Sequence, residues 1–230
     1  LGIKNGKHQV FFDSTGQLRK EENYLNGKLH GLVQEYNRSG DTLLYMNYAL
    51  DIPHGIQRTY YPDGKRFKVI SYKNGLLDGS HLTYTAEGKL ELKLSYKEGK
   101  KDGVFIFYHD NEKEAGKETW SLDLKNGEFI TFNEEGKILK QGTYKKNIAI
   151  GEHNVFDSKG KLIHQTTYDK KGVKTYEMEV DEYGDQKVLY AASGPAKPAG
   201  IEEDDDPKNI EPVNEKKNKR KKRKERRKKE

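Results

Sequence analysis

The segment GSHLTYTAEGKLELKLSY, residues 79–96, is one unit of a pattern that recurs every 24 residues along the chain. Apolar and polar side chains alternate in residues 90–96, which is typical of a half-buried β-strand. Residues 85–88 separate the two alternating runs and end in Gly88, which can supply the positive φ that a short hairpin connection requires. Each unit is therefore predicted to be a β-hairpin.

Four columns of residues keep the same interval. The motif glycines are Gly31, Gly55, Gly79, Gly103, Gly127 and Gly151, and each is followed five residues later by an aromatic residue, namely Tyr36, Tyr60, Tyr84, Tyr108, Phe132 and Phe156. The turn glycines are Gly16, Gly40, Gly64, Gly88, Gly136, Gly160 and Gly184, and the second aromatic column is Tyr24, Tyr48, Tyr72, Tyr96, Trp120, Tyr144 and Tyr168. Chance does not hold this register over about seven units, so the chain is a repeat array. Such arrays usually present an extended surface and seldom enclose a catalytic pocket.

Composition agrees with an array. Hydrophobic residues make up 32% of the chain and charged residues 35%, which is thin for one compact core. The absence of cysteine excludes disulfides, cysteine-ligated zinc and a thiol nucleophile. No apolar run approaches the roughly 20 residues that span a bilayer. Because the chain begins at Leu1, a truncated or processed start is expected; a cytoplasmic location is favoured, and a periplasmic or secreted one stays open if a signal peptide has been removed.

Hairpins joined end to end predict an all-β fold, a single-layer antiparallel β-meander solenoid of about seven 24-residue β-hairpin repeats with a disordered C-terminal tail. The repeat array is expected at 1–190, a linker rich in proline and acidic residues at 191–215, and a basic tail at 216–230. Residues 109–119 contain few strand-forming residues, which predicts a short or irregular second arm in that unit or, as an alternative, an acidic contact site. Residues 172–190 are read as a degenerate end unit.

The stretch NGKLHG at residues 26–31, followed by Tyr36, the Gly40 turn and a strand ending at Tyr48, resembles the MORN-repeat variant family. The resemblance extends over residues 5–168. It implies a curved single-layer β-meander whose repeats are mainly interaction modules, some of them in antitoxin-like bacterial proteins. The chain departs from the pattern where other residues replace a motif or turn glycine, at Lys7, Glu112 and Thr175.

A polar column directly precedes the motif glycines and consists of His30, His54, Asp78, Asp102 and Asn126. Equivalent positions in successive hairpins are about 9–10 Å apart, whereas the ligands of one zinc ion all lie about 2 Å from it. No metal site and no cofactor are therefore expected. The column is read as short polar residues at a strand-entry turn, with a partner-binding edge as the alternative. The pairs Asn26–Gly27, Asn74–Gly75 and Asn126–Gly127 are predicted to mark bends between units.

Catalytic motifs are missing from the sequence. It contains no nucleophile elbow, no glycine loop that opens a helix and no His-Glu-x-x-His pattern. The chain is therefore expected not to be an enzyme and to have no small-molecule substrate. Core packing explains Trp120, the one tryptophan, better than ligand binding does.

The basicity of the chain is concentrated in its last fifteen residues, 216–230, which hold twelve basic and two acidic side chains. The predicted polyanion-binding residues are Lys216, Lys217, Lys219, Arg220, Lys221, Lys222, Arg223, Lys224, Arg226, Arg227, Lys228 and Lys229. Phosphate neutralisation by these side chains would be strongly salt-dependent. RNA, an anionic membrane surface and a nuclear import receptor fit equally well, and a solubilising tail that folds back on the acidic run 202–206 is the alternative.

Three hypotheses about function follow. The leading one is a non-enzymatic scaffold that binds a protein partner along its β-solenoid surface and attaches to a polyanion through its basic tail. The second is an RNA- or membrane-associated protein that acts mainly through the tail. The third, which rests on the family resemblance, is a toxin-neutralising module.

Overall fold

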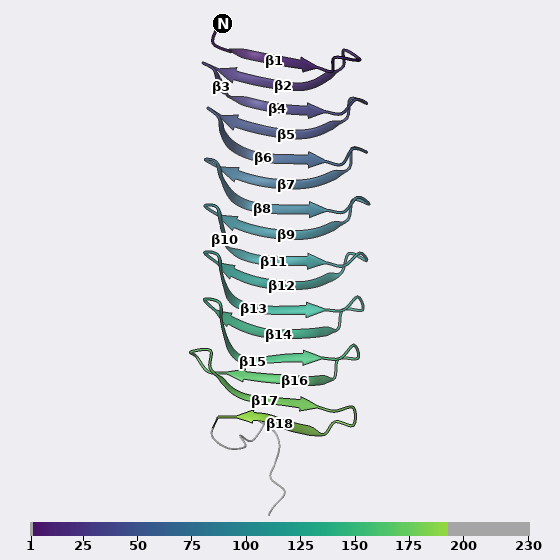
Figure 1. The fold of residues 1–230 in the computed structure, drawn as a ribbon, viewed down its shortest axis with the longest axis vertical. Coiled ribbons are helices and arrows are strands. Elements are labelled where there is room, and N and C mark those ends of the chain that lie inside the picture. Colours follow the sequence, from purple (N-terminus) through teal and green to yellow (C-terminus); the bar gives the residue numbers. More distant parts are fainter. Residues whose placement is uncertain (1, 193–230) are drawn as a thin grey trace, which may run out of the picture. The chain divides into compact units, whose positions relative to one another are not determined.

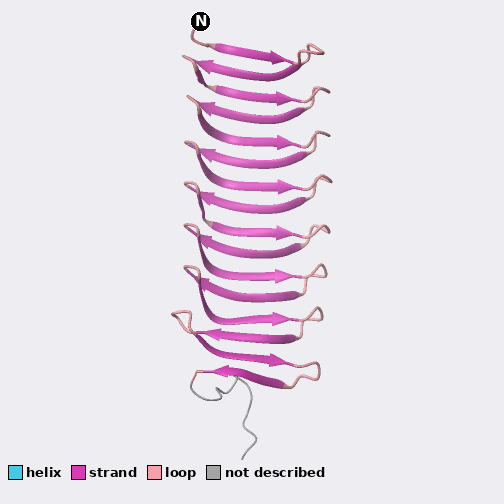
Figure 2. Cartoon of the chain, viewed as in Figure 1, coloured by secondary structure: helices cyan, strands magenta, loops and turns pink. Residues whose placement is uncertain are grey.

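The computed structural model describes residues 2–192, and these residues form an all-β array (Figure 1, Figure 2). Most of the predicted linker and the whole predicted basic tail, residues 193–230, lie outside the described residues. Eighteen strands form one sheet within residues 2–192. Their bounds are β1 Gly6–Phe11, β2 Leu18–Leu25, β3 Lys28–Leu29, β4 Gly31–Tyr36, β5 Thr42–Ala49, β6 Ile52–Tyr60, β7 Arg66–Lys73, β8 Leu76–Tyr84, β9 Leu90–Lys97, β10 Lys100–Lys101, β11 Gly103–Tyr108, β12 Glu114–Ser121, β13 Leu124–Phe132, β14 Ile138–Lys145, β15 Ile148–Phe156, β16 Leu162–Tyr168, β17 Lys174–Val180 and β18 Gln186–Ala191. The same range contains no helix with the length and apolarity needed to cross a membrane.

The sheet is an antiparallel meander in which each strand pairs with the next one along the chain. The first hairpin pairs β1 with β2, and the last pairs β17 with β18. The short segments β3 and β10 are separated from β4 and β11 by a single residue each, and each pair together serves as one arm of a hairpin. The predicted single-layer β-meander of hairpin repeats is confirmed.

Four-residue turns connect the two arms of each hairpin and follow one long side of the array, on the right in Figure 1. All seven predicted turn glycines have positive φ, from 67° at Gly16 to 103° at Gly184, as expected for these connections. Glu112 occupies the same turn position with φ 64°. The predicted short or irregular arm near 109–119 is wrong, because β12 has eight residues and pairs with β11 and β13 on its two sides. Pairing on both sides overrides the weak local strand propensity of this segment.

Two-residue turns make six of the seven connections between successive hairpins, all but the longer one from β16 to β17, and follow the opposite long side of the array, on the left in Figure 1. Both residues of each turn have positive φ, for example 49° and 83° at Asn26–Gly27, which is the type I′ geometry that matches strand twist. The turn at Asn74–Gly75 is confirmed as well. The predicted bend at Asn126–Gly127 is wrong, because both residues lie within β13. The bend before that strand falls at Leu122–Asp123, where φ is 50° and 67°.

Aromatic side chains stack from one hairpin to the next on one face of the sheet. Tyr96 packs against Phe105 with ring centroids 5.7 Å apart, and Phe105 packs against Trp120 at 5.6 Å. Phe105, Val33 and Met46 are each only 3% exposed. A single layer with no second sheet thus buries side chains by stacking them along the array.

The motif glycines have a structural role that the period alone does not reveal. Gly127 has φ 134°, and a Cβ atom placed on it would lie 2.8 Å from Cβ of Thr119 on the preceding strand. Gly127 therefore allows a backbone conformation and a close approach between hairpins that L-residues do not tolerate.

Candidate interaction surfaces

The long side that carries the six two-residue turns is here called the two-residue-turn edge, defined as residues 25–28, 49–52, 73–76, 97–100, 121–124 and 145–148. Hydrogen bonds join each of its turns to the hairpin before. The Asp51 amide donates to the Leu29 carbonyl at 2.8 Å, and the Leu29 amide donates to Oδ1 of Asp51 at 2.7 Å. Asp123 and Lys101 repeat this pair of bonds at 3.0 Å and 2.8 Å. Carboxylates on this edge thus contribute to joining the hairpins.

The predicted partner column lies beside this edge, and three of its members accept hydrogen bonds from the following turn. Oδ2 of Asp78 accepts from the Glu98 amide at 3.2 Å, and Oδ2 of Asp102 accepts from the Leu122 amide at 3.3 Å. Oδ1 of Asn126 accepts from the Lys146 amide at 3.3 Å. His30 and His54, the other two members, are exposed. The strand-entry interpretation explains the first three residues; a role for the column in partner binding stays a prediction.

The most exposed groups on the two-residue-turn edge are ones that the column analysis missed. Large apolar side chains that are at least 40% exposed gather here: Leu25, Leu50, Ile52, Leu76, Leu122 and Ile148. Six exposed lysines lie among them: Lys28, Lys73, Lys97, Lys100, Lys145 and Lys146. These residues vary in type from unit to unit, so no conserved column marks them in the sequence.

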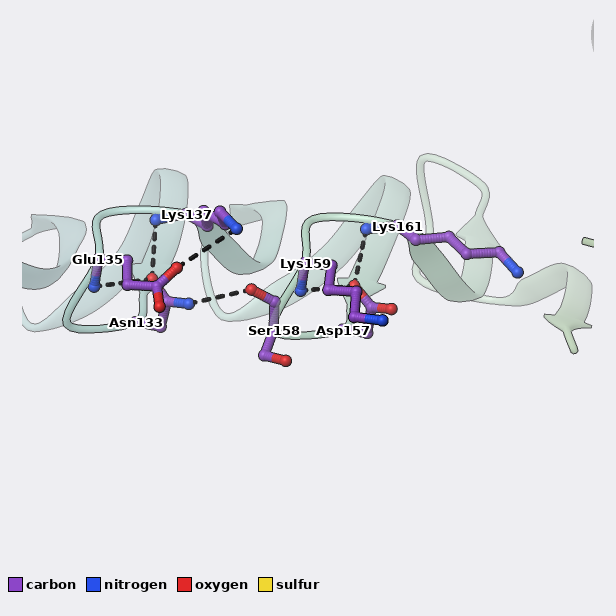
Figure 3. Close-up of polar contacts among 7 residues, drawn as sticks. All are labelled: Asn133, Glu135, Lys137, Asp157, Ser158, Lys159 and Lys161. Carbon is purple, nitrogen blue, oxygen red and sulfur yellow. Dashed lines mark hydrogen bonds and ion pairs between the residues drawn. The ribbon is translucent and has the colours of Figure 1, made fainter. Parts of the chain in front are cut away.

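The opposite side of the array is built from side chains that organise its four-residue turns (Figure 3). Oδ1 of Asn133 accepts hydrogen bonds from the amides of Glu135 and Lys137 at 3.1 Å and 2.9 Å. Its Nδ2 donates to the Ser158 carbonyl of the next turn at 3.2 Å. Asn133 therefore closes its own turn and links two neighbouring hairpins.

Asp157 closes the next turn in the same way (Figure 3). Its Oδ1 accepts from the amides of Lys159 and Lys161, both at 2.8 Å. The amide hydrogen bonds, with that of Lys161 the strongest, hold the pKa of the Asp157 carboxyl below its usual value. Nζ of Lys161 donates to the Asp181 carbonyl at 2.7 Å, so lysine side chains on this side bind the turn that follows.

Trp120 lies half-buried within a small polar and aromatic cluster. Nζ of Lys101 lies 4.4 Å from the indole centroid and Nζ of Lys125 lies 5.5 Å from it, which are cation–π distances. The indole Nε1–H donates to Glu118 at 3.1 Å, and Lys125 pairs with the same carboxylate at 2.9 Å. Since Trp120 also stacks on Phe105, its contacts are those of a packed residue.

His81 lies on the aromatic face, and both of its ring nitrogens are buried without a hydrogen-bond partner within residues 2–192. Burial lowers the pKa of the imidazole, and the positive charge of Lys68 lowers it further. The ring contacts Tyr96, with centroids 6.1 Å apart. His81 is therefore held neutral at the cost of two unmade hydrogen bonds.

Residues 2–192 contain no group of three or more histidine, aspartate or glutamate side chains placed to hold one metal ion. The twelve basic residues predicted to bind a polyanion, between 216 and 229, lie outside the described range.

The hairpins match a known repeat. A family model described as the MORN repeat variant matches residues 5–26, 53–74, 77–98 and 125–146. The chain is a MORN-repeat protein of the variant family. Each MORN match covers one hairpin with its four-residue turn, and the hairpins between the matches have the same strands and turns. MORN repeats form repeat scaffolds, generally without enzymatic activity, that commonly mediate protein or membrane interactions.

Comparison with solved structures gives weaker similarities. A chain of a TcdB2-TccC3-Cdc42 complex is 10% identical over 79% of this chain and 15% of its own length, with a TM-score of 0.13. This MORN chain thus spans about 15% of that protein. A protein of unknown function from Bacteroides fragilis NCTC 9343 is 12% identical over 81% of this chain and 90% of its own, with a TM-score of 0.12. At these TM-scores the similarities establish neither fold nor function. No match was found among curated proteins.

Proposed function

We propose that the MORN array is a non-enzymatic scaffold that binds a protein partner along its surface, while the basic residues 216–229 attach the protein to a polyanion. The supporting observation is the array itself, in which residues 6–191 form one uninterrupted meander of hairpins. Such a layer exposes two faces and two long edges to a partner. The concentration of basic residues after residue 215 supplies an independent electrostatic contact.

Affinity capture from a lysate of the source organism tests this proposal. The full chain is compared with a full-length variant in which the twelve tail lysines and arginines are replaced by glutamine. We expect both proteins to retain the same protein partner at high salt, because contacts with the array do not depend on the tail charge. Only the unmodified chain is expected to retain nucleic acid or anionic lipid at low salt and to lose it as salt rises.

Two outcomes contradict the proposal. If the glutamine variant captures no protein at any salt concentration, the tail is the active part, and the RNA or anionic-membrane hypothesis replaces the scaffold. If the two proteins capture identical sets of molecules at low salt, the tail has no polyanion partner. Mass spectrometry identifies captured proteins, and nucleic-acid staining and lipid extraction identify the polyanion.

A further inference from the structure

The two long sides of the MORN array differ sharply in what they expose. The two-residue-turn edge carries six large apolar side chains that are at least 40% exposed. The matching five-residue connections on the opposite side, residues 37–41, 61–65, 85–89, 109–113, 133–137 and 157–161, carry no exposed large apolar side chain; the last turn on that side holds one, Tyr183. Because isolated exposed apolar residues are common, the informative fact is that six of them follow one side of the sheet.

Two of these residues are unfavourable for the fold. Leu50 and Leu122 each occupy the first position of a type I′ turn, with φ 53° and 50°, and are 46% and 58% exposed. Asn26 and Asn74 occupy the equivalent position in two other units, with φ 49° and 50°, and the polar residues Glu98 and Lys146 occupy it in the remaining two, with φ 50° and 51°. Leucine at positive φ is strained, whereas asparagine tolerates this conformation and is also more soluble. The fold therefore gives no reason for leucine here, and such local exceptions tend to mark functional positions.

The charge on this edge is predominantly positive. Its six turns contain six lysines and three carboxylates, Asp51, Glu98 and Asp123. None of the six lysines forms an ion pair with another residue in the range 2–192, and all are exposed. Asp51 and Asp123 accept backbone hydrogen bonds from the preceding hairpin. The matching five-residue connections on the opposite side contain seven basic side chains and eight carboxylates.

Neighbouring apolar side chains on this edge belong to successive hairpins and form a row in two parts, on either side of residues 97–100. A Cβ placed on Gly75 would lie 3.2 Å from Cγ2 of Ile52, and one on Gly99 would lie 3.6 Å from Cδ2 of Leu76. Ile52 and Leu76 thus each lie against the next turn. Equivalent positions are two strand spacings apart, about 9–10 Å, which equals the rise of about three residues in an extended chain.

We propose that the two-residue-turn edge binds an acidic protein segment that carries apolar side chains, with the apolar groups seated along the leucine and isoleucine row and the carboxylates beside the lysines. This inference rests on the proposed scaffold function and assigns it an edge and a partner chemistry. Leu50 and Leu122 contribute apolar contact, and Lys97 and Lys100, between the two parts of the row, contribute charge. The complementarity of a basic edge and an acidic segment favours such a partner.

A labelled peptide of repeated Leu-Glu-Asp triplets is the probe, because in a polyproline II conformation its leucines lie on one face about 9.3 Å apart, close to the spacing of the hairpins. Binding to the full chain is measured by fluorescence anisotropy, beside a control peptide of Ser-Glu-Asp triplets. The basic tail attracts both peptides equally, so the difference between them reports the apolar row. We expect the leucine peptide to bind more tightly than the serine peptide. In the double variant L50N and L122N, the affinity for the leucine peptide is expected to fall about tenfold and to approach that for the serine peptide.

The asparagine replacements suit positive φ, so a loss of binding in this variant does not reflect unfolding. A matched control is Ile56→Thr, which removes a 41% exposed apolar side chain within strand β6, away from the edge. That variant is expected to bind both peptides as the unmodified chain does. Lys97→Gln with Lys100→Gln is expected to weaken binding of both peptides and to reduce its dependence on salt.

Three results overturn the inference. The first is that the protein binds the leucine and serine peptides with equal affinity. The second is that the L50N and L122N variant binds the leucine peptide as tightly as the unmodified chain does. The third is that the variant changes only binding to phosphatidylserine vesicles or self-association of the protein. The scaffold function is judged separately. If lysate capture keeps its protein partner in the L50N and L122N variant, the scaffold stands and the edge assignment fails.

Discussion

Replacing Gly127 by alanine is expected to destabilise the array far more than replacing Gly151, although both are motif glycines of the same column. Gly127 has φ 134°, and an added Cβ would lie 2.8 Å from Cβ and 3.0 Å from Cγ2 of Thr119. Gly151 has φ 68°, and an added Cβ meets nothing within 4 Å. Both positions therefore have a positive φ. Gly127 lies further from the left-handed helical region than Gly151 does, and it has less space for an added Cβ.

The expected losses follow from these values. Alanine in the left-handed region costs about 1 kcal/mol, so Gly151→Ala is expected to lower the unfolding free energy by about that amount. At Gly127 the more strained backbone costs about 1–3 kcal/mol, and forcing a methyl group against Thr119 costs about 1–3 kcal/mol more. We expect Gly127→Ala to lose about 2–6 kcal/mol in total.

Urea denaturation of the full chain, followed by fluorescence, measures both losses. The one tryptophan, Trp120, lies on β12 and pairs with Lys125 on β13, so its emission reports the hairpin in which Gly127 lies. Thr119→Gly in the Gly127→Ala background is expected to restore part of the stability, measured in a double-mutant cycle with Thr119→Gly alone. Equal losses at Gly127 and Gly151, or no coupling with residue 119, would refute the argument from close approach.

Three further changes test other parts of the structure. Burial lowers the pKa of His81 below the usual histidine value of about 6.5, and the charge of Lys68 lowers it further, so the folded state favours the neutral imidazole. This contribution to stability is therefore full above about pH 6.5 and is lost as the pH falls through the lowered pKa, and His81→Leu is expected to flatten this part of the pH profile in denaturation experiments. Asn133→Ala is expected to lower the free energy of unfolding by about 1–2 kcal/mol, measured by thermal unfolding, because the amides of Glu135 and Lys137 lose their side-chain acceptor. Asn133→Asp should cost less, because it keeps that acceptor and loses only the hydrogen bond to the Ser158 carbonyl. Leu122→Asn should raise the unfolding free energy by about 0.5–1 kcal/mol, since asparagine suits the first position of a type I′ turn, and a clear loss of stability would show that leucine serves the fold.

The repeat architecture was predictable because its determinants recur. One unit, residues 79–96, contains the strand alternation, the turn glycine and the motif glycine, and the 24-residue period extends the interpretation to the other units. The predicted hairpins and the positive φ of the turn glycines are confirmed. Repetition therefore converts a weak local prediction into a strong one.

The predictions that were wrong relied on the local sequence of a single unit instead of the repeat pattern. Asn126–Gly127 has the composition of a type I′ turn, yet it lies within β13 because the preceding bend is fixed at Leu122–Asp123. The amides of Leu122 and Asp123 donate to Asp102 and to the Lys101 carbonyl, and these bonds hold the bend in place although neither of its residues is asparagine or glycine. Tertiary contacts between neighbouring hairpins thus override local turn propensity.

The two-residue-turn edge could not be predicted from the sequence as a binding surface, because its residues do not recur from unit to unit. Column analysis finds positions that stay constant, and the polar column before the motif glycines turned out to include backbone caps such as Asp78 and Asp102. A binding surface on a repeat scaffold consists of positions that the fold leaves free, so their residue types vary from unit to unit. Leu50 and Leu122 became conspicuous only once their positive φ and exposure were known, because only then could leucine be compared with the asparagine that the same turn holds elsewhere. In an array of this kind, function is best sought at the positions where a unit departs from the residue that its own geometry favours.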